Sequence, residues 1–233
     1  MSNTKGFDVS EFQSSVDFKS AKKDGYEFVI IRAGYGRYST QKDTKFDKYV
    51  KDAHNAGFEI GSYWLTYAQT TEEAREEADL FCDTVEATGY TFNMPLYCDV
   101  EVDGLPNNKT VLTNIVYAFC EKLEERGYYA GIYCNVNFAQ NRMYIDEHTP
   151  YDVWLADYSD ADDTPNINNG MWQYTNAGTL PGTPGAIDLD RAYIDYPATI
   201  KSAGLNRPNK SKNSLKEIVK NFVESVGKYL GDA

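Results

Sequence analysis

The first 190 residues alternate between short apolar runs and longer stretches in which apolar residues recur with helical spacing. The apolar runs are nearly continuous and are bounded by turn residues, so we predict that they are β-strands. The predicted strands span residues 6–10, 28–34, 59–67, 95–102, 129–135, 152–158, 170–175 and 186–190. Continuous apolar strands are typical of a parallel sheet that helices cover on its faces.

Amphipathic helices are clearest at residues 44–56, 71–87 and 109–126. The second carries several glutamates on its early turns, Glu77 among them, where negative charge complements the helix dipole. Four helical stretches end in a glycine followed by an aromatic residue: Gly25-Tyr26, Gly57-Phe58, Gly89-Tyr90 and Gly127-Tyr128. Glycine is favoured just past a helix because it adopts the left-handed conformation without strain. Each pair therefore predicts a crossing from helix to strand.

Eight strands with intervening helices predict an α/β fold, a small (β/α)8-type barrel. Its last helices are expected to be abbreviated, because the sequence after residue 135 shows little helical pattern. An open, doubly wound sheet is the alternative. No Gly-rich phosphate loop follows the first strand, which argues against the nucleotide-binding form of that alternative.

The chain changes character near residue 200. We assign residues 1–200 to the barrel, and residues 201–214, which are polar, basic and contain Pro208, to a linker. Residues 215–233 are predicted to form an amphipathic C-terminal helix, because their apolar positions recur with helical spacing. Three hypotheses account for its apolar face: packing on the barrel, homodimer formation, and the start of a truncated binding module.

Composition indicates a globular protein whose partner is not polyanionic. A chain of 233 residues, 42% of them apolar, is long enough to bury a substantial core. The formal charge of −12 argues against nucleic acid or an anionic membrane as a partner. This charge is unevenly distributed, because residues 1–200 carry −16 and residues 201–233 carry +4. No apolar stretch is long enough to predict membrane insertion.

Cysteine and histidine positions indicate neither a metal site nor another cofactor. The four cysteines lack C-x-x-C spacing, and His54 and His148 lie far apart. Each cysteine falls in an apolar run, so we predict reduced, buried thiols. The N-terminus lacks the apolar segment of a secretory signal, so we expect synthesis in the bacterial cytoplasm and release by lysis or a helper protein.

Candidate chemistry is concentrated at Asp99 and Glu101, near the end of the predicted strand 95–102. Side chains two residues apart on a strand point to the same face, so these carboxyls are expected side by side. One carboxylate raises the pKa of its neighbour, which allows a protonated acid beside an ionised partner. The alternative interpretation is a strand end that simply faces water.

Other predicted strands bring further acids to the same mouth. Asp8 lies in strand 6–10, Asp188 and Asp190 lie in strand 186–190, and Arg32 lies near the end of strand 28–34. In a parallel barrel the reactive residues lie at the C-terminal strand ends. Three acidic strand ends are difficult to explain by coincidence, so the acid/base interpretation is favoured.

Aromatic residues are predicted at the same rim: Tyr63, Tyr67, Tyr97, Tyr133, Trp154, Tyr158, Trp172 and Tyr174. A carboxylate cluster surrounded by Tyr and Trp is suited to hydrolysis of a glycosidic bond. One acid protonates the leaving oxygen, a carboxylate supports the oxocarbenium-like transition state, and aromatic rings hold the sugars.

The motifs also resemble the family 25 glycoside hydrolases, which are lysozymes (N-acetylmuramidases) of bacteria, fungi and phage endolysins. The resemblance covers about residues 5–196 and rests on the following segments in order. They are DVS at 8–10 with Phe12-Gln13, VIIRAGYG at 29–36, GSYWLTYA at 61–68, LYCDVE at 96–101, GIYCNVNF at 131–138, WLADY at 154–158, WQYT at 172–175 and AIDLD at 186–190.

The resemblance implies cleavage of the β-1,4 bond between N-acetylmuramic acid and N-acetylglucosamine in cell-wall peptidoglycan. It implies that Glu101 is the general acid, with Asp99 as its companion and Asp8 and Asp188 as further acids of the site. Asp190 ranks lower because the family often has Asn there. Substrate contacts are expected from Tyr63, Tyr67, Tyr97, Tyr133, Trp154 and Arg32. Trp64 and Leu65 depart from the usual residues of the family, which leaves the adjacent sugar subsite open.

A peptidoglycan-binding barrel without catalysis is the alternative function, although a lectin has no need of four clustered acids. A chitinase-like barrel usually carries a longer D-x-x-D-x-D-x-E motif, which is absent here. A phage endolysin is the more economical origin for a chain without a signal peptide. Because bacterial walls are anionic, the acidic barrel needs compensation, for which the basic tail, a wall-binding module or a dimer are hypotheses.

Overall fold

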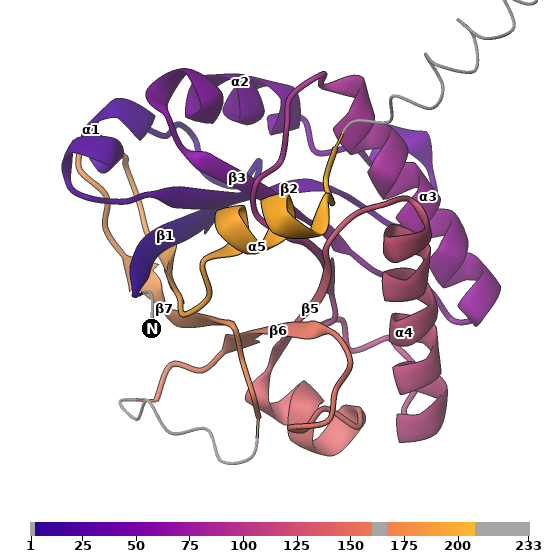
Figure 1. Cartoon of the computed structure of the whole chain (residues 1–233). Coiled ribbons are helices and arrows are strands. Elements are labelled where there is room, and N and C mark those ends of the chain that lie inside the picture. Colours follow the sequence, from indigo (N-terminus) through magenta and orange to yellow (C-terminus); the bar gives the residue numbers. More distant parts are fainter. Residues whose placement is uncertain (1–2, 160–166, 208–233) are drawn as a thin grey trace, which may run out of the picture.

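The computed structural model describes residues 3–159 and 167–207. Within these residues, eight strands close into a barrel in sequence order (Figure 1). The strands are β1 (Thr4–Val9), β2 (Phe28–Tyr35), β3 (Glu59–Leu65), β4 (Leu96–Asp99), β5 (Ala130–Asn135), β6 (Asp152–Ala156), β7 (Met171–Gly178) and β8 (Ile187–Ala192). The predicted (β/α)8-type barrel is confirmed, with shifts at the strand ends.

Helices follow each of the first four strands and surround that half of the barrel. They are α1 (Phe18–Lys23), α2 (Phe46–Ala56), α3 (Thr71–Ala87) and α4 (Lys109–Glu125), with a 3-10 turn η1 (Ser39–Gln41) before α2. After β5 the described chain forms only a π-helical turn, η2 (Phe138–Arg142), before β6. Abbreviated helices after residue 135 are therefore confirmed for the described part of the chain.

The glycines that follow the first four helices adopt the conformation predicted for them. Gly25, Gly57, Gly89 and Gly127 have φ angles of 86°, 79°, 71° and 85°. After three of them the next residue donates its backbone N–H to a carbonyl in the preceding helix, as Phe58 does to Ala53 at 3.1 Å. This bond closes the helix end and turns the chain into the next strand.

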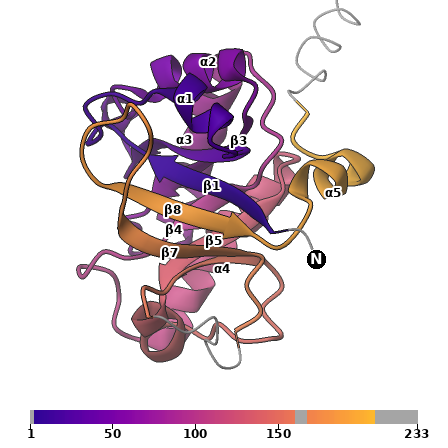
Figure 2. The same cartoon turned by 90° about the vertical axis from the view of Figure 1, so that its left-hand side faces the viewer.

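Strand β8 runs antiparallel to both of its neighbours, β1 and β7 (Figure 2). The expectation of a wholly parallel barrel is therefore wrong for this strand. Only residues 179–186 separate β7 from β8, and a parallel connection needs about a dozen residues or more. As a result, the N-terminal end of β8 lies at the mouth formed by the C-terminal ends of the other strands.

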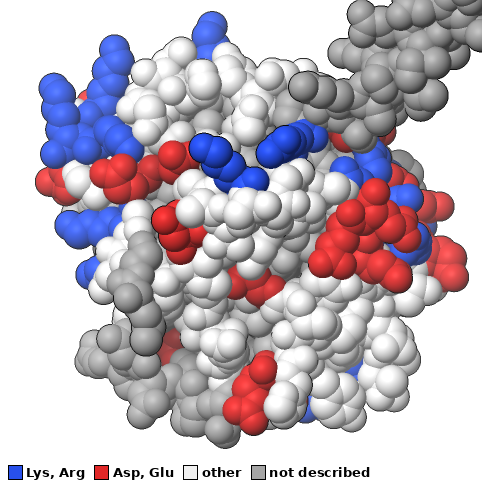
Figure 3. All heavy atoms as spheres, in the orientation of Figure 1, with Lys and Arg blue, Asp and Glu red and all other residues white. Residues whose placement is uncertain are grey.

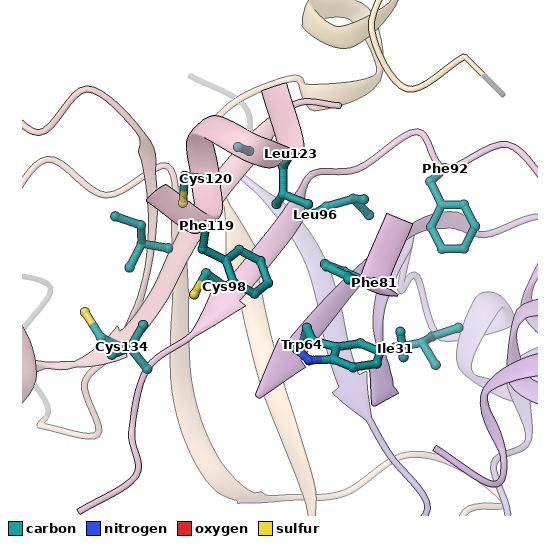
Figure 4. Packing of buried hydrophobic residues seen from close by; sticks show 14 of the residues in the cluster. Ile31, Trp64, Phe81, Phe92, Leu96, Cys98, Phe119, Cys120, Leu123 and Cys134 are labelled. Carbon is teal, nitrogen blue, oxygen red and sulfur yellow. The ribbon is translucent and has the colours of Figure 1, made fainter. Parts of the chain in front are cut away.

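The outer core lies between the sheet and the helices and contains mainly aromatic and aliphatic side chains (Figure 4). Trp64 of β3 is fully buried, with its ring centroid 5.7 Å from that of Phe81 on α3. Cys98 of β4 and Cys120 of α4 are buried in the same layer. All four cysteines are free and buried, which confirms the predicted reduced thiols.

Glu77, one of the glutamates on the early turns of α3, lies in the protein interior. It is fully buried beneath the connection from β3 to α3, where its carboxyl accepts the backbone N–H of Tyr67 at 3.3 Å. Burial raises the pKa of Glu77 from its usual 4.5 to about 7. Glu72 and Glu73, two others of the glutamates predicted on the early turns of this helix, lie in the first turn of α3.

The interior of the barrel is filled by large side chains that pack against glycines on neighbouring strands. A Cβ atom at Gly6 of β1 would lie 2.2 Å from the ring of Phe28 on β2. A Cβ atom at Gly131 of β5 would likewise lie 2.4 Å from the ring of Tyr97 on β4. These positions therefore require glycine, because the neighbouring aromatic ring occupies the space of any side chain.

Helix α5 (Tyr196–Ala203) lies across the end of the barrel opposite the mouth (Figure 1). The Tyr196 hydroxyl donates to Asp152 at 2.7 Å, and Ile200 is buried with the interior residues. Asn206 is also buried, and its side chain donates to the carbonyls of Phe92 and Met94.

The predicted domain boundary at residue 200 therefore falls inside α5, and the chain belongs to the barrel at least as far as Asn206. The reason is that α5 and Asn206 supply the apolar and hydrogen-bonding groups that close this end. Residues 208–214 of the predicted linker and the predicted helix 215–233 lie outside the described residues, as does any dimer built on that helix.

Ion pairs gather along α3 and α4, where red and blue side chains lie together in Figure 3. Arg126 contacts Asp79, Asp83 and Glu86, each at 2.8 Å. These pairs locally offset the acidity of the barrel.

No helix within residues 3–159 and 167–207 is long and apolar enough to cross a membrane.

We expect Gly131→Ala to destabilise the barrel by about 1–3 kcal/mol, because the added methyl group displaces the Tyr97 ring in a packed interior. Gly104→Ala is the matched control, since a Cβ atom there meets no atom within 4 Å. Urea denaturation followed by circular dichroism measures both. Equal midpoints for the two variants would contradict this account of the interior.

Candidate functional site

A cavity of about 200 Å³ lies at the mouth of the barrel. Its lining comes from seven strands, all but β2, and the loops after them: Asp8, Tyr63, Asp99, Glu101, Tyr133, Trp154, Tyr158, Gln173, Asn176 and Asp188. A larger cavity of about 530 Å³ lies at the opposite end, beside α5, and contains none of the predicted site residues. The four acids predicted to be catalytic therefore all line the smaller cavity.

The structure brings together the four predicted acids. Asp8 projects from β1, and Asp99 is the last residue of β4. Glu101 lies two residues beyond β4, because the predicted strand 95–102 ends at Asp99. Asp188 lies near the start of β8, directly opposite Asp8 in the antiparallel pairing of the two strands.

Asp99 and Glu101 differ in their surroundings although both line the cavity. Asp99 is almost fully buried, and burial holds the pKa of its carboxyl well above the usual range. The charge of Glu101 raises the Asp99 pKa further, whereas Arg32 lowers it. Glu101 reaches solvent, yet the surrounding cavity walls and then the charge on Asp188 raise its pKa. Both carboxyls thus hold protons at a higher pH than ordinary acids.

Asp190 forms the floor beneath Asp8 and Asp188. It is fully buried, and its Oδ1 accepts the indole N–H of Trp154 at 2.9 Å. Its Oδ2 has no hydrogen-bond partner among the described residues. Burial raises the pKa of Asp190 and of Asp8, and each also lies in the field of neighbouring acids. Mutual repulsion in a buried cluster prevents all of these carboxyls from being ionised together.

Gln173 of β7 connects Asp8 to the aromatic wall of the cavity. Its Nε2 donates to Asp8 Oδ2 at 2.6 Å, while its Oε1 accepts the hydroxyls of Tyr133 at 2.9 Å and Tyr158 at 2.6 Å. This arrangement fixes the orientation of the amide, because only the oxygen can accept two hydroxyl protons. The bond from Gln173 favours the ionised form of Asp8 and so lowers its pKa against the effect of burial.

Trp154 forms the aromatic centre of the site. Its ring centroid lies 4.4 Å from that of Tyr133 and 6.0 Å from that of Tyr63, and all three residues line the cavity. Burial holds the pKa of both tyrosines well above the usual range, so their hydroxyls stay protonated, and the proton of Tyr133 is already donated to Gln173. The predicted positions of Tyr63, Tyr133 and Trp154 at one face of the mouth match their place in the structure.

Three other predicted contact residues lie outside the cavity lining. Tyr97 lies beneath Trp154 in the barrel interior, where its hydroxyl donates to Asp152 at 2.8 Å. Arg32 is buried in ion pairs with Glu11 and Asp43, each at 2.8 Å. Tyr67 follows β3 and is 45% exposed.

Sequence reasoning missed Gln173 and Asn176 of β7. It assigned Trp172 and Tyr174 to the rim, but these two side chains pack against each other with tilted rings, whose centroids are 5.5 Å apart, and do not line the cavity. Alternation along the strand means that Gln173 then faces the interior. The available signal was the position of Gln173 between two aromatic residues in the WQYT segment.

The site supplies proton donors and acceptors from carboxyl groups and polar contacts from tyrosine hydroxyls. Within residues 3–159 and 167–207, no group of three or more His, Cys, Asp or Glu has the arrangement of a metal site. An exposed acid with a raised pKa beside buried carboxyls and aromatic rings suits proton transfer to a neutral, ring-shaped substrate.

The sequence and the fold resemble those of known glycosidases. The family model described as glycosyl hydrolases family 25 matches residues 7–183. An autolytic lysozyme of Clostridium acetobutylicum is 30% identical over 190 residues, which cover 80% of this chain and 55% of that protein. An N,O-diacetylmuramidase of Arthroderma benhamiae is 33% identical over 87 residues, which cover 37% of this chain and 34% of that protein.

Among solved structures, the modular autolysin LytC of Streptococcus pneumoniae has a similar fold, with a TM-score of 0.74 at 24% identity. The match covers 82% of this chain and 47% of LytC. This chain thus spans about half the length of LytC and of the clostridial lysozyme.

We expect Asp188→Asn to lower the pKa of Glu101, because it removes the negative charge that opposes ionisation of Glu101. A carbon-13 NMR titration of the glutamate carboxyls measures the change. Asp103→Asn is the control, since Asp103 is an exposed acid of the same loop that does not line the cavity. A Glu101 pKa that is unchanged in Asp188→Asn would contradict the described electrostatics.

Proposed function

The chain belongs to glycosyl hydrolase family 25, and we propose that it is a peptidoglycan hydrolase of the lysozyme type. The bond cleaved is the β-1,4 linkage between N-acetylmuramic acid and N-acetylglucosamine. The observation that carries the proposal is the convergence of Asp8, Asp99, Glu101 and Asp188 in one aromatic-lined cavity. Clustered carboxyls with raised pKa values are the groups that glycosidic hydrolysis requires.

Glu101 acts as the general acid in this proposal. Its carboxyl is the most accessible of the clustered acids, so it can reach the glycosidic oxygen of a bound strand. The raised pKa keeps a larger fraction protonated near neutral pH than an ordinary glutamate would have. Protonation of the leaving oxygen allows the C–O bond to break, and water then supplies the new hydroxyl group.

Asp99 assists from the deeper side of the cavity. Burial raises the Asp99 pKa, but Arg32 lowers it and so favours the ionised form. This ionised form stabilises the positive charge that develops on the sugar ring, either by direct attack at the anomeric carbon or by orienting the 2-acetamido group. When Glu101 transfers its proton, the resulting carboxylate repels Asp99, and Arg32 partly offsets the negative charge nearby. The two carboxyls therefore act as a coupled pair.

Asp8 and Asp188 face each other across β1 and β8 and complete the acidic wall. Their negative charges act on the Glu101 carboxyl, and their oxygens accept hydrogen bonds from sugar hydroxyls. Tyr63, Tyr133 and Trp154 supply aromatic faces that hold the sugar ring in place, and the Tyr63 hydroxyl can donate to it.

We expect Glu101→Gln to reduce the hydrolysis of purified peptidoglycan by about 10²–10⁴-fold or more, because the amide cannot donate the catalytic proton. Its thermal unfolding curve by circular dichroism should match that of the wild type. Asp103→Asn serves as the control and should retain the wild-type rate. A wild-type rate in folded Glu101→Gln would exclude Glu101 as the acid.

The products identify the bond that is cleaved. After borohydride reduction, mass spectrometry of the wild-type digest should find muramitol at the new reducing ends. Glucosaminitol ends would indicate cleavage of the other glycosidic bond. Folded wild-type protein that binds peptidoglycan without releasing fragments would favour the non-catalytic binding barrel.

A further inference from the structure

Three aromatic side chains form a row on the β1–β3 side of the mouth, outside the cavity. The aromatic row consists of Phe12, Tyr35 and Tyr67, of which Phe12 is 79% exposed, Tyr67 is 45% exposed and Tyr35 is half-buried. Within the described residues, none of the three belongs to either buried core cluster. Large apolar side chains that are exposed together often mark a binding surface.

Arg32 joins the members of the aromatic row. Its guanidinium carbon lies 4.8 Å from the ring centroid of Phe12 and 5.8 Å from that of Tyr35. The ring centroids of Tyr35 and Tyr67 are 6.2 Å apart. The guanidinium already forms ion pairs with Glu11 and Asp43. Arg32 therefore supports the rings, and its charge is not free to bind an anion.

The turn that carries Phe12 is held firmly although the ring itself faces solvent. The backbone N–H of Ser10 donates to the Gln13 side chain at 2.8 Å, and that of Glu11 donates to Asp43 at 2.9 Å. The Gln13 carbonyl accepts the Tyr49 hydroxyl at 2.7 Å. A fixed turn that exposes an apolar ring is preorganised for contact with a ligand, because little entropy is lost on binding.

The aromatic row continues directly from the wall of the cavity. Arg32 of β2 pairs in register with Tyr63 of β3, which lines the cavity. Tyr35 pairs with Leu65, which in turn pairs with Asp99. The cavity of about 200 Å³ is smaller than the about 300–1,000 Å³ typical of sites for drug-sized ligands, so a polymeric substrate must extend beyond it.

We propose that the aromatic row is an outer glycan-binding site, which holds a sugar ring of the strand beyond those in the cavity. This proposal rests on the proposed peptidoglycan hydrolase function and extends its substrate contacts to Phe12 and Tyr35. Aromatic faces suit the C–H face of a sugar ring, while the neutralised Arg32 offers nothing to the carboxylates of stem peptides. The expected ligand is therefore the glycan strand rather than its peptides.

Binding is tested in the Glu101→Gln background, so that hydrolysis does not consume the ligand. Peptide-free glycan strands and the disaccharide of N-acetylglucosamine and N-acetylmuramic acid are titrated, and intrinsic fluorescence follows binding near Trp154. Phe12→Ala should weaken binding of the long strands by about five- to tenfold and leave the disaccharide unaffected. Phe12→Trp should restore binding of the long strands.

Tyr144→Ala is the matched control. Tyr144 is 55% exposed and stacks under Lys109 at 4.9 Å, but it lies beside η2 and outside the aromatic row. It should bind both ligands like the parent protein.

Equal weakening of both ligands, or no change in either, would overturn the proposal. Weakening that requires stem peptides on the strands would overturn it in favour of a peptide site. Hydrolysis by the wild type is measured separately. Phe12-dependent binding by a wild-type protein that cleaves nothing would refute the proposed reaction while supporting the outer site.

Discussion

Closure of the barrel by an antiparallel strand is the constraint on which the rest of the structure depends. Strand β8 completes the sheet by pairing with β7 on one side and β1 on the other. This pairing sets Asp188 opposite Asp8 and Asp190 opposite Gly6, whose lack of a side chain makes room for Phe28 in the interior. A parallel eighth strand would reverse β8 and carry Asp188 towards the closed end. Asp188 therefore joins the other acids of the site because a short connection forces the last strand to reverse direction.

The same closure makes the acids difficult to ionise. Asp8, Asp99 and Asp190 are buried among aromatic side chains, and removal of water from a carboxyl favours its neutral form. Few groups counter this effect: Gln173 donates to Asp8, Trp154 donates to Asp190, and Arg32 acts on Asp99. A raised folded-state pKa means that these carboxyls favour folding most at low pH and lose that contribution as pH rises through their pKa values. Glu77 adds to this dependence, chiefly between pH 4.5 and about 7. The outer core and the closed end at α5 must therefore supply the free energy of folding that offsets the cost of burying these carboxyls.

The two ends of the barrel have different roles, one in stability and the other in ligand contact. At the closed end, α5 and Asn206 satisfy backbone groups and bury apolar side chains. At the mouth, polar and aromatic side chains from seven strands remain available to a ligand. The single Trp154 ring separates the two regions, with Tyr97 beneath it and Tyr63 and Tyr133 beside the cavity. The rigid closed end thereby holds the strand ends, and hence the acids, in fixed positions.

The elements, apart from their exact ends, and the identity of the acids could be predicted from the amino-acid sequence. Continuous apolar strands, glycines after helices and the D-x-E pair of Asp99 and Glu101 are local patterns. Such patterns can be recognised without knowing which distant residues come into contact. Four features emerged from the tertiary contacts: the direction of β8, the burial of Glu77, the extension of the barrel to Asn206 and the role of Gln173 between Asp8 and two tyrosines. Each of these depends on residues far apart in the chain, such as the 165 positions that separate Asp8 from Gln173. Which face of a strand or helix becomes interior is set by barrel closure, and closure is a property of the whole chain.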